Sequence, residues 1–250
     1  MTTTFRSLCA SELTKLTTTR APRWILVSAA FLSALAVSGR VASVVLAQDE
    51  LATDAALRTV FAHGGLGAIL PLILGILISA GEYRHGTVVD TFLTEPRRAR
   101  VIGAKLLAGA TAGVVAGIGC AIATAVTASA WYSAKDVTFD LGSTAVVKSL
   151  VGIVLWDLLY AVIGVAVGSL IRAQAAAIVT AVVWIFVAET ALSGLVVSLG
   201  RWLPATAART VGNAPDAGLL PQVGAGVVLL GWAAVAAVGA AAVTTRRDVA

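Results

Sequence analysis

Six long runs of apolar residues constrain this chain more than any other feature of its sequence. An α-helix needs about 20 apolar residues to cross the hydrocarbon core of a bilayer. Because lipid offers no hydrogen-bond partners to a bare backbone, such runs are expected to fold as helices. The sequence therefore predicts an all-α integral membrane protein in which one domain, residues 1–250, has six transmembrane helices. The runs cover about residues 24–46, 66–80, 101–130, 148–171, 175–199 and 223–243.

The composition excludes several other classes of protein. Hydrophobic residues make up 58% of the chain and charged residues 12%, whereas roughly 25% of the residues in soluble domains are charged. The net charge is +5, but the basic residues lie between apolar runs and not on one basic face, which argues against nucleic acid as a partner. The two cysteines, Cys9 and Cys120, lie far apart, so we expect neither a disulfide nor a metal site.

The distribution of Lys and Arg predicts the orientation. Twice as many of them fall on one side as on the other. The richer side holds both termini, residues 81–100, Lys105 and Arg172. Basic residues accumulate on the cytoplasmic side of membrane proteins. We therefore expect a multi-pass protein of the cell membrane with both termini in the cytoplasm.

Small residues recur every four positions in two of the predicted spans. Gly109, Gly113 and Gly117 do so in the third span, and Gly164 and Gly168 in the fourth. This spacing lets helix backbones approach closely in lipid. It predicts that these faces are contacts between helices.

The N-terminal segment, residues 1–20, is typical of an amphipathic helix lying at the membrane surface in contact with lipids. Glu12 falls on the apolar side of this helix, and two explanations are open. It pairs with Lys15, one turn along the helix, or it binds a basic residue of the second loop. The apolar side consists of Phe5, Leu8, Cys9, Leu13 and Leu16, which gather on one face at 100° per residue.

Residues 81–100, the second loop, are the most informative stretch. Thr87 and Asp90 have the spacing of a capping box, and Pro96 would end the element. This pattern predicts a short amphipathic helix, which either docks on its own bundle or binds another cytoplasmic protein. Its apolar stripe is formed by Val88, Val89, Phe92 and Leu93.

Three segments resemble the small permease subunits of ABC-2 type transporters of actinobacterial kind, and their order and spacing make the resemblance cover nearly the whole chain. The first is the opening Ser11-Glu12-Leu13-Thr14-Lys15-Leu16. The second is Glu82-Tyr83-Arg84-His85-Gly86-Thr87 with Pro96-Arg97-Arg98 and Lys105-Leu106. The third is the turn Gly168-Ser169-Leu170-Ile171-Arg172-Ala173-Gln174 with the alanines that follow it.

The resemblance implies an ABC-2 type transmembrane domain whose residues 1–20 form an elbow helix, with Glu12 and Lys15 as its notable polar residues. It implies two partners, a separate ABC ATPase that carries ATP and Mg²⁺ and a second permease copy, identical or related. Residues 200–222 would form short helices dipping in from outside. Residues 81–100 would be the coupling segment, through Glu82, Tyr83, Arg84, His85, Thr87, Val88, Asp90, Phe92, Arg97 and Arg98.

The residues themselves leave the function open among three classes. No phosphate-binding loop Gly-x-x-x-x-Gly-Lys-Ser/Thr exists in the chain, so we expect no enzyme activity and no cofactor on this subunit. Asp157 and Glu189 lie inside apolar runs, where carboxyls are costly and face protein or water. Either each is hydrogen-bonded to Ser, Thr or Tyr or is protonated, or one of them lines a substrate path or a subunit interface. The favoured function is an exporter permease driven by a separate ATPase. The alternatives are an ion-coupled secondary transporter and a non-transporting scaffold that relays ATPase motion.

Overall fold

The computed structural model describes residues 4–43, 51–215 and 218–246, which form helices and connecting turns without a strand. Six helical spans in this part of the chain are long and apolar enough to cross a membrane, which confirms the predicted fold class at that level. The spans are Arg20–Ser43, Asp54–His85, Arg98–Ala134, Thr144–Ile171, Gln174–Leu195 and Gln222–Arg246.

Several spans are single helices, whereas the second and fifth are assembled from shorter pieces. The second joins α4, the 3₁₀ turn η1 and α5, and the fifth joins α9, the π-helical turn η2 and α10. The helices are α1 (Phe5–Thr18), α2 (Arg20–Ser43), α4 (Asp54–Ala62), η1 (His63–Ala68), α5 (Ile69–His85), α6 (Val88–Thr94), α7 (Arg98–Ala134), α8 (Thr144–Ile171), α9 (Gln174–Val183), η2 (Trp184–Ala188), α10 (Glu189–Leu195), α11 (Val197–Gly200), α12 (Pro204–Val211) and α13 (Gln222–Arg246).

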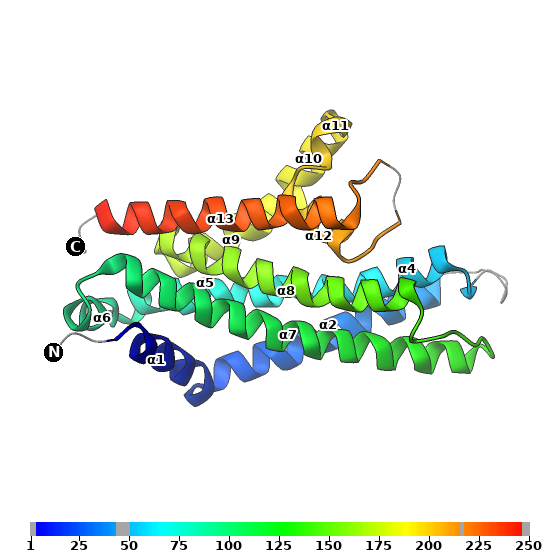
Figure 1. Ribbon diagram of the computed structural model, residues 1–250, viewed down its shortest axis with the longest axis horizontal. Helices are drawn as coiled ribbons and strands as arrows, with labels where there is room; N and C mark the ends of the chain where they lie inside the picture. The colour runs from blue at the N-terminus through cyan, green and yellow to red at the C-terminus, as the bar shows by residue number, and fades with distance from the viewer. Residues whose placement is uncertain (1–3, 44–50, 216–217, 247–250) are drawn as a thin grey trace.

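The long helices run side by side, and short elements gather at both ends of the bundle (Figure 1). One end holds α1, α6 and the last turns of α13, and we call it the terminal end. The other end holds the start of α4 and the end of α7, and we call it the opposite end. An even number of spans brings the first and last described helices to the same end, as the predicted topology requires.

The second span begins earlier than the sequence predicted. The second apolar run was placed at about residues 66–80, but α4 starts at Asp54, with the Thr53 hydroxyl accepting a hydrogen bond from the Ala56 amide. The helix is amphipathic and buries Leu57 and Phe61. Because polar residues separate its apolar ones, it gives no continuous apolar run, and a prediction from such runs therefore missed it. The first span also begins early, at Arg20, while its predicted end at residues 44–46 lies outside the described residues.

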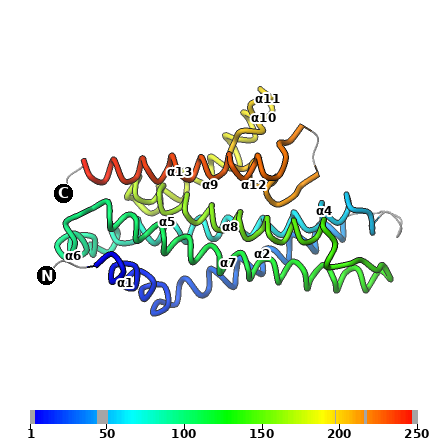
Figure 2. The backbone as a smooth tube through the Cα atoms, viewed as in Figure 1, coloured from blue at the N-terminus to red at the C-terminus, as the bar shows by residue number. Residues whose placement is uncertain are grey.

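The fifth span ends earlier than predicted. A π-helical turn at Trp184–Ala188 interrupts it, and α10 stops at Leu195, not at Leu199. From that turn onward α10 and α11 lean away from the bundle (Figures 1 and 2). Turns of this kind are often found at functional sites.

The centre of the bundle is α8, which packs against α5, α7 and α13. A Cβ atom on Gly113 would lie 2.6 Å from the Leu158 Cα, and one on Gly164 would lie 2.0 Å from the Leu72 carbonyl oxygen. Neither distance leaves room for a side chain, so glycine is what permits these backbones to touch. The small-residue contacts predicted for the third and fourth spans are confirmed.

A buried asparagine fastens the opposite end. The Asn213 side-chain amide donates to the Ala145 carbonyl at 3.1 Å and to the Ser149 hydroxyl at 3.0 Å, while its own carbonyl accepts from Arg58. The side chain of Asn213 thus binds α8, and its backbone carbonyl binds Arg58 of α4. These bonds hold the chain after α12 against both helices. The predicted short helix within residues 200–222 is present as α12, and its dipping into a membrane from outside stays a prediction.

Candidate functional site

Four charged side chains meet at the terminal end. Glu12 and Lys15 come from α1, Glu82 from α5 and Lys105 from α7. Lys105 Nζ lies 2.7 Å from Glu82 Oε1 and 3.1 Å from Glu12 Oε2. Lys15 Nζ lies 2.5 Å from Glu12 Oε1 and 2.6 Å from Glu82 Oε1. We call Glu12, Lys15, Glu82 and Lys105 the charge cluster.

Each carboxylate of the charge cluster contacts both ammonium groups, so its charges balance. The Lys105 side chain is 4% exposed and both glutamates are buried, whereas Lys15 is 46% exposed. Burying a charge is expensive unless the charge is paired and hydrogen-bonded. The buried charges of α1, α5 and α7 are therefore paired only when these three helices are packed together.

Lys15 lies in α1, outside the membrane-spanning segments. Burial lowers its pKa, but hydrogen bonds to Glu12 and Glu82 and their negative charges outweigh that effect, so the pKa is raised above 10.5. The ammonium form is thus held by its partners.

Glu12 pairs with Lys15 one turn along α1, as the first explanation expected. Its second partner is Lys105, which was grouped by sequence with the basic residues of the second loop but lies past residue 100, in α7. The apolar side of α1 meanwhile packs against α7 and α2. The amphipathic pattern thus serves packing on the bundle, and lipid contact of α1 stays a prediction.

The short helix predicted in the second loop is present as α6. Gly86, with a φ of 71°, ends α5 in the left-handed conformation that glycine adopts without a Cβ clash. The predicted capping box is absent: Thr87 is in αR conformation, and its side chain makes no capping hydrogen bond. The left-handed Gly86 already sets the direction of the chain, so α6 begins without a side-chain cap.

α6 is bonded to the charge cluster and to its neighbours. The Thr91 hydroxyl lies 3.2 Å from the Thr87 carbonyl oxygen and 3.4 Å from Glu82 Oε2, and it shares its one proton between these two acceptors. Arg98 lies over the Phe92 ring, 5.4 Å from its centre, and donates to the Thr244 carbonyl of α13 at 3.1 Å. The loop is thus tied to the second, third and sixth spans.

The charged end of α5 reaches the turn between the fourth and fifth spans. The Arg172 guanidinium lies over the Tyr83 ring at 5.2 Å, and Arg84 donates to the Gln174 side chain at 3.5 Å. Two segments on which the family resemblance rests, 82–87 and 168–174, are therefore in contact. We regard this contact as part of the site.

The predicted coupling residues fall into two groups. Residues that contact the bundle are Glu82, Tyr83, Val88, Phe92 and Arg98. Residues whose side chains are exposed are Arg84, His85, Thr87, Asp90 and Arg97. Val89 and Leu93, 49% and 76% exposed, are the apolar side chains that α6 presents outward.

Sequence reasoning missed several residues of this site. Lys105 entered as part of a resembling segment and was not predicted to pair inside the bundle, and Glu95, which is buried and accepts from the Arg97 amide at 3.1 Å, was not singled out. Thr91 was passed over too. A buried carboxyl two residues before a basic pair gives no local signal, because its partners are decided by the tertiary fold.

Both carboxyls inside the spans are buried, but their partners differ from the Ser, Thr or Tyr that the sequence suggested. Asp157 Oδ1 accepts from the Cys120 thiol at 3.6 Å, and Glu189 Oε2 accepts from the Ala205 amide at 2.7 Å. Glu189 is 2% exposed. The α12 helix, which supplies Ala205, could not be placed beside Glu189 from spacing alone.

Comparison with known proteins gives no family assignment, because the sequence matches no protein-family model and no curated protein. The fold and its apolar spans define the class, a multi-pass all-helical membrane protein. In the part of the chain that the structure describes, no three His, Cys, Asp or Glu side chains gather as metal ligands. The function is therefore argued from the charge cluster, α6 and the intramembrane carboxyls.

Proposed function

We propose that this chain is the permease subunit of an ABC-2 type transporter in the cell membrane, working as an exporter. Its ATP and Mg²⁺ are bound by a separate ATPase subunit, and a second permease copy completes the transport unit. Both termini and α6 face the cytoplasm. Closure of the ATPase pushes on α6 and changes how the spans of the two permeases meet.

The observation that carries this proposal is the bonding of α6 to the charge cluster. Thr91 of α6 donates to Glu82, and Glu82 binds Lys15 of α1 and Lys105 of α7. A force applied to α6 is therefore passed to three helices through polar contacts, of which those of Lys105 are buried and those of Thr91 and Lys15 are half-buried. Bonded networks of this kind can transmit a displacement between distant sites.

The outer surface of α6 suits a protein partner. Val89 and Leu93 are one turn apart and strongly exposed, and Asp90 and Arg97 lie beside them in exposed positions. An apolar centre with a charged rim is the usual anatomy of a protein interface. The apolar residues fill a cleft in the partner, as helix-in-groove binding requires.

Site-specific crosslinking tests the proposal. In a Cys9→Ser, Cys120→Ala background, Leu93→Cys is treated with a bifunctional maleimide in native membranes, and adducts are identified by mass spectrometry. We expect an adduct with an ABC ATPase and ATP-driven uptake into inverted vesicles. Leu141→Cys, 48% exposed at the opposite end, is the matched control and should give no ATPase adduct. Flux that persists without any ATPase would refute the proposal.

One observation favours an ion-coupled secondary transporter as a second candidate. Glu189 lies in the wall of a half-open cavity, and carboxyls at such positions carry protons or ions in many transporters. Flux driven by a proton gradient in vesicles that contain this chain alone would support it. A scaffold would show no flux in either experiment.

A further inference from the structure

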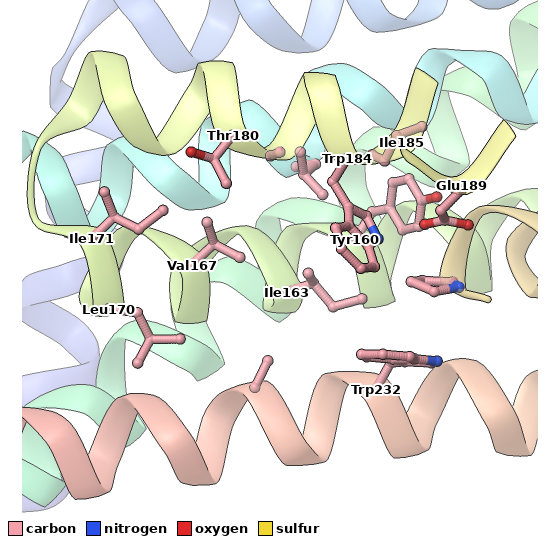
Figure 3. Close-up of a pocket in the computed structure, with 14 residues that line it drawn as sticks. Tyr160, Ile163, Val167, Leu170, Ile171, Thr180, Trp184, Ile185, Glu189 and Trp232 are labelled. Carbon is pink, nitrogen blue, oxygen red and sulfur yellow. The ribbon is translucent and has the colours of Figure 1, made fainter. Parts of the chain in front are cut away.

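A cavity of 340 Å³ lies between α8, the broken fifth span and α13 (Figure 3). α5 and α12 contribute to its wall through Leu72 and Pro204. The wall is almost entirely apolar, and its size lies in the range of small-molecule sites. The π-helical turn of the fifth span forms one side.

The two ends of the cavity differ in chemistry. Figure 3 shows the Glu189 carboxyl at the end where Tyr160, Trp184 and Trp232 gather. The other end is aliphatic and is formed by Val167, Leu170 and Ile171, with Thr180 on the facing helix. A ligand that fills the cavity would therefore have one polar end and one apolar end.

The carboxyl at the aromatic end is incompletely satisfied. Glu189 Oε2 accepts from the Ala205 amide at 2.7 Å, while Oε1 has no hydrogen-bond partner among the described residues. The Tyr160 hydroxyl is equally without one. Among the described residues that line the cavity there is no Lys, Arg or His. A buried carboxyl of this kind stays neutral by holding a proton, and it ionises favourably only beside a cation. A cation supplied by a ligand would therefore complete this site.

We propose that the cavity binds an amphipathic cation, a molecule with one ammonium group and an apolar chain. The ammonium pairs with Glu189 and lies against the aromatic rings, whose faces attract cations. The chain lies along the aliphatic end. A neutral lipid tail would fill the same volume but leave Glu189 Oε1 unpaired. That the cation is the exported substrate rests on the function proposed above.

Binding to the purified chain without ATPase tests the site. Decyltrimethylammonium and the neutral decyldimethylphosphine oxide are titrated into nanodiscs that hold the protein, with empty nanodiscs as the baseline for lipid partition. We expect saturable binding of the cation, with at least tenfold lower affinity for the neutral amphiphile. Glu189→Gln should lower cation affinity at least tenfold and leave the neutral amphiphile unchanged.

Two further variants separate charge from folding and shape. Asp157→Asn removes the other buried carboxyl, which does not line the cavity, and should bind the cation like the unchanged protein. Ala236→Phe fills the apolar wall and should weaken both amphiphiles. Equal affinity for cation and neutral amphiphile, or no effect of Glu189→Gln, would overturn the proposal and assign the cavity to a lipid tail.

The outcomes for the site and for the transporter are distinguishable. Saturable cation binding without ATP-driven flux would leave the cation site standing and reject the permease function. ATP-driven flux of another solute, with no cation binding, would support the permease function and reject the cation site.

Discussion

Glu12 and Lys105 lie 93 positions apart in the sequence, yet Glu12 Oε2 accepts a hydrogen bond from Lys105 Nζ at 3.1 Å. Both side chains are buried. Lys15 and Glu82 complete the charge cluster, in which each acid meets both bases. Because the charges balance, removing any one of them leaves an excess charge in a buried place.

Lys105→Met should be strongly destabilising. It leaves Glu12 and Glu82 with Lys15 as their remaining cation in the cluster, and breaking a buried ion pair costs about 3–5 kcal/mol. Unfolding in mixed micelles by a denaturing detergent measures this loss. Lys148→Met, at an exposed position of the opposite end, is the control. A difference between the two variants of less than about 1 kcal/mol would show that the cluster is not a stabilising element.

The stability contributed by Lys15 should depend on pH in the alkaline range. Its pKa is raised in the folded protein above the unfolded value of 10.5. The contribution is therefore complete below pH 10.5 and is lost as the pH rises through the folded pKa. Thermal unfolding of the unchanged protein and of Lys15→Met should differ by a constant amount up to that pH and converge above it. The Lys15→Arg variant keeps its positive charge, so the difference between its thermal stability and that of Lys15→Met should persist above that pH.

Gly164→Ala should disrupt the packing of α8 on α5. The new Cβ would lie 2.0 Å from the Leu72 carbonyl oxygen, so the helices must move apart. Overpacking of this kind costs about 1–3 kcal/mol. Gly239→Ala in α13 is the control, because nothing lies within 4 Å of its Cβ position. If both variants unfold alike, the close contact of α8 and α5 contributes little.

The sequence predicted the parts of this fold that lipid imposes. Apolar runs gave the six spans, and glycine spacing gave the faces of α7 and α8 that touch. Both signals are local, because span length and the period of small residues can be read within one helix. α6 was predicted for the same reason, from one apolar stripe between breakers.

The partners of the polar groups could not be predicted, because they depend on how distant helices meet. Thr91 of α6 and Lys105 of α7 reach the same carboxyl, Glu82, from different elements. Ala205 meets Glu189 only because the fifth span breaks and α12 returns to the bundle. Neither the π-helical turn at Trp184–Ala188 nor the start of α4 has a marker in hydropathy.

Cysteine labelling tests the orientation. We expect Asp90→Cys, in α6, to react with a membrane-impermeant maleimide only after intact cells are permeabilised, because basic residues flank this segment. Leu141→Cys, in the turn before α8, should react without permeabilisation. Reaction of position 90 from outside would invert the topology and remove α6 as a site for a cytoplasmic ATPase.

The contact of α6 with an ATPase should depend most on Leu93. This side chain is 76% exposed, whereas Phe92 is half-buried beneath Arg98. We therefore expect Leu93→Ala to weaken ATPase copurification by about 2 kcal/mol, the cost of truncating a central interface residue. Its own thermal unfolding should be unchanged, because an exposed side chain contributes little to the fold. Phe92→Ala should weaken both binding and stability, since it also removes the ring under Arg98.

Two further variants test the contact of α6 with an ATPase, one that removes a charge beside α6 and one at the opposite end of the bundle. Arg84→Ala should weaken ATPase binding mildly and more visibly at high salt, because exposed charges orient partners more than they hold them and salt screens them. Leu141→Ala, at the opposite end, should leave ATPase binding unchanged. Full ATPase binding and full ATP-driven flux in the Leu93→Ala and Phe92→Ala variants together would exclude α6 as the coupling element. In that case the charge cluster would be explained by stability alone.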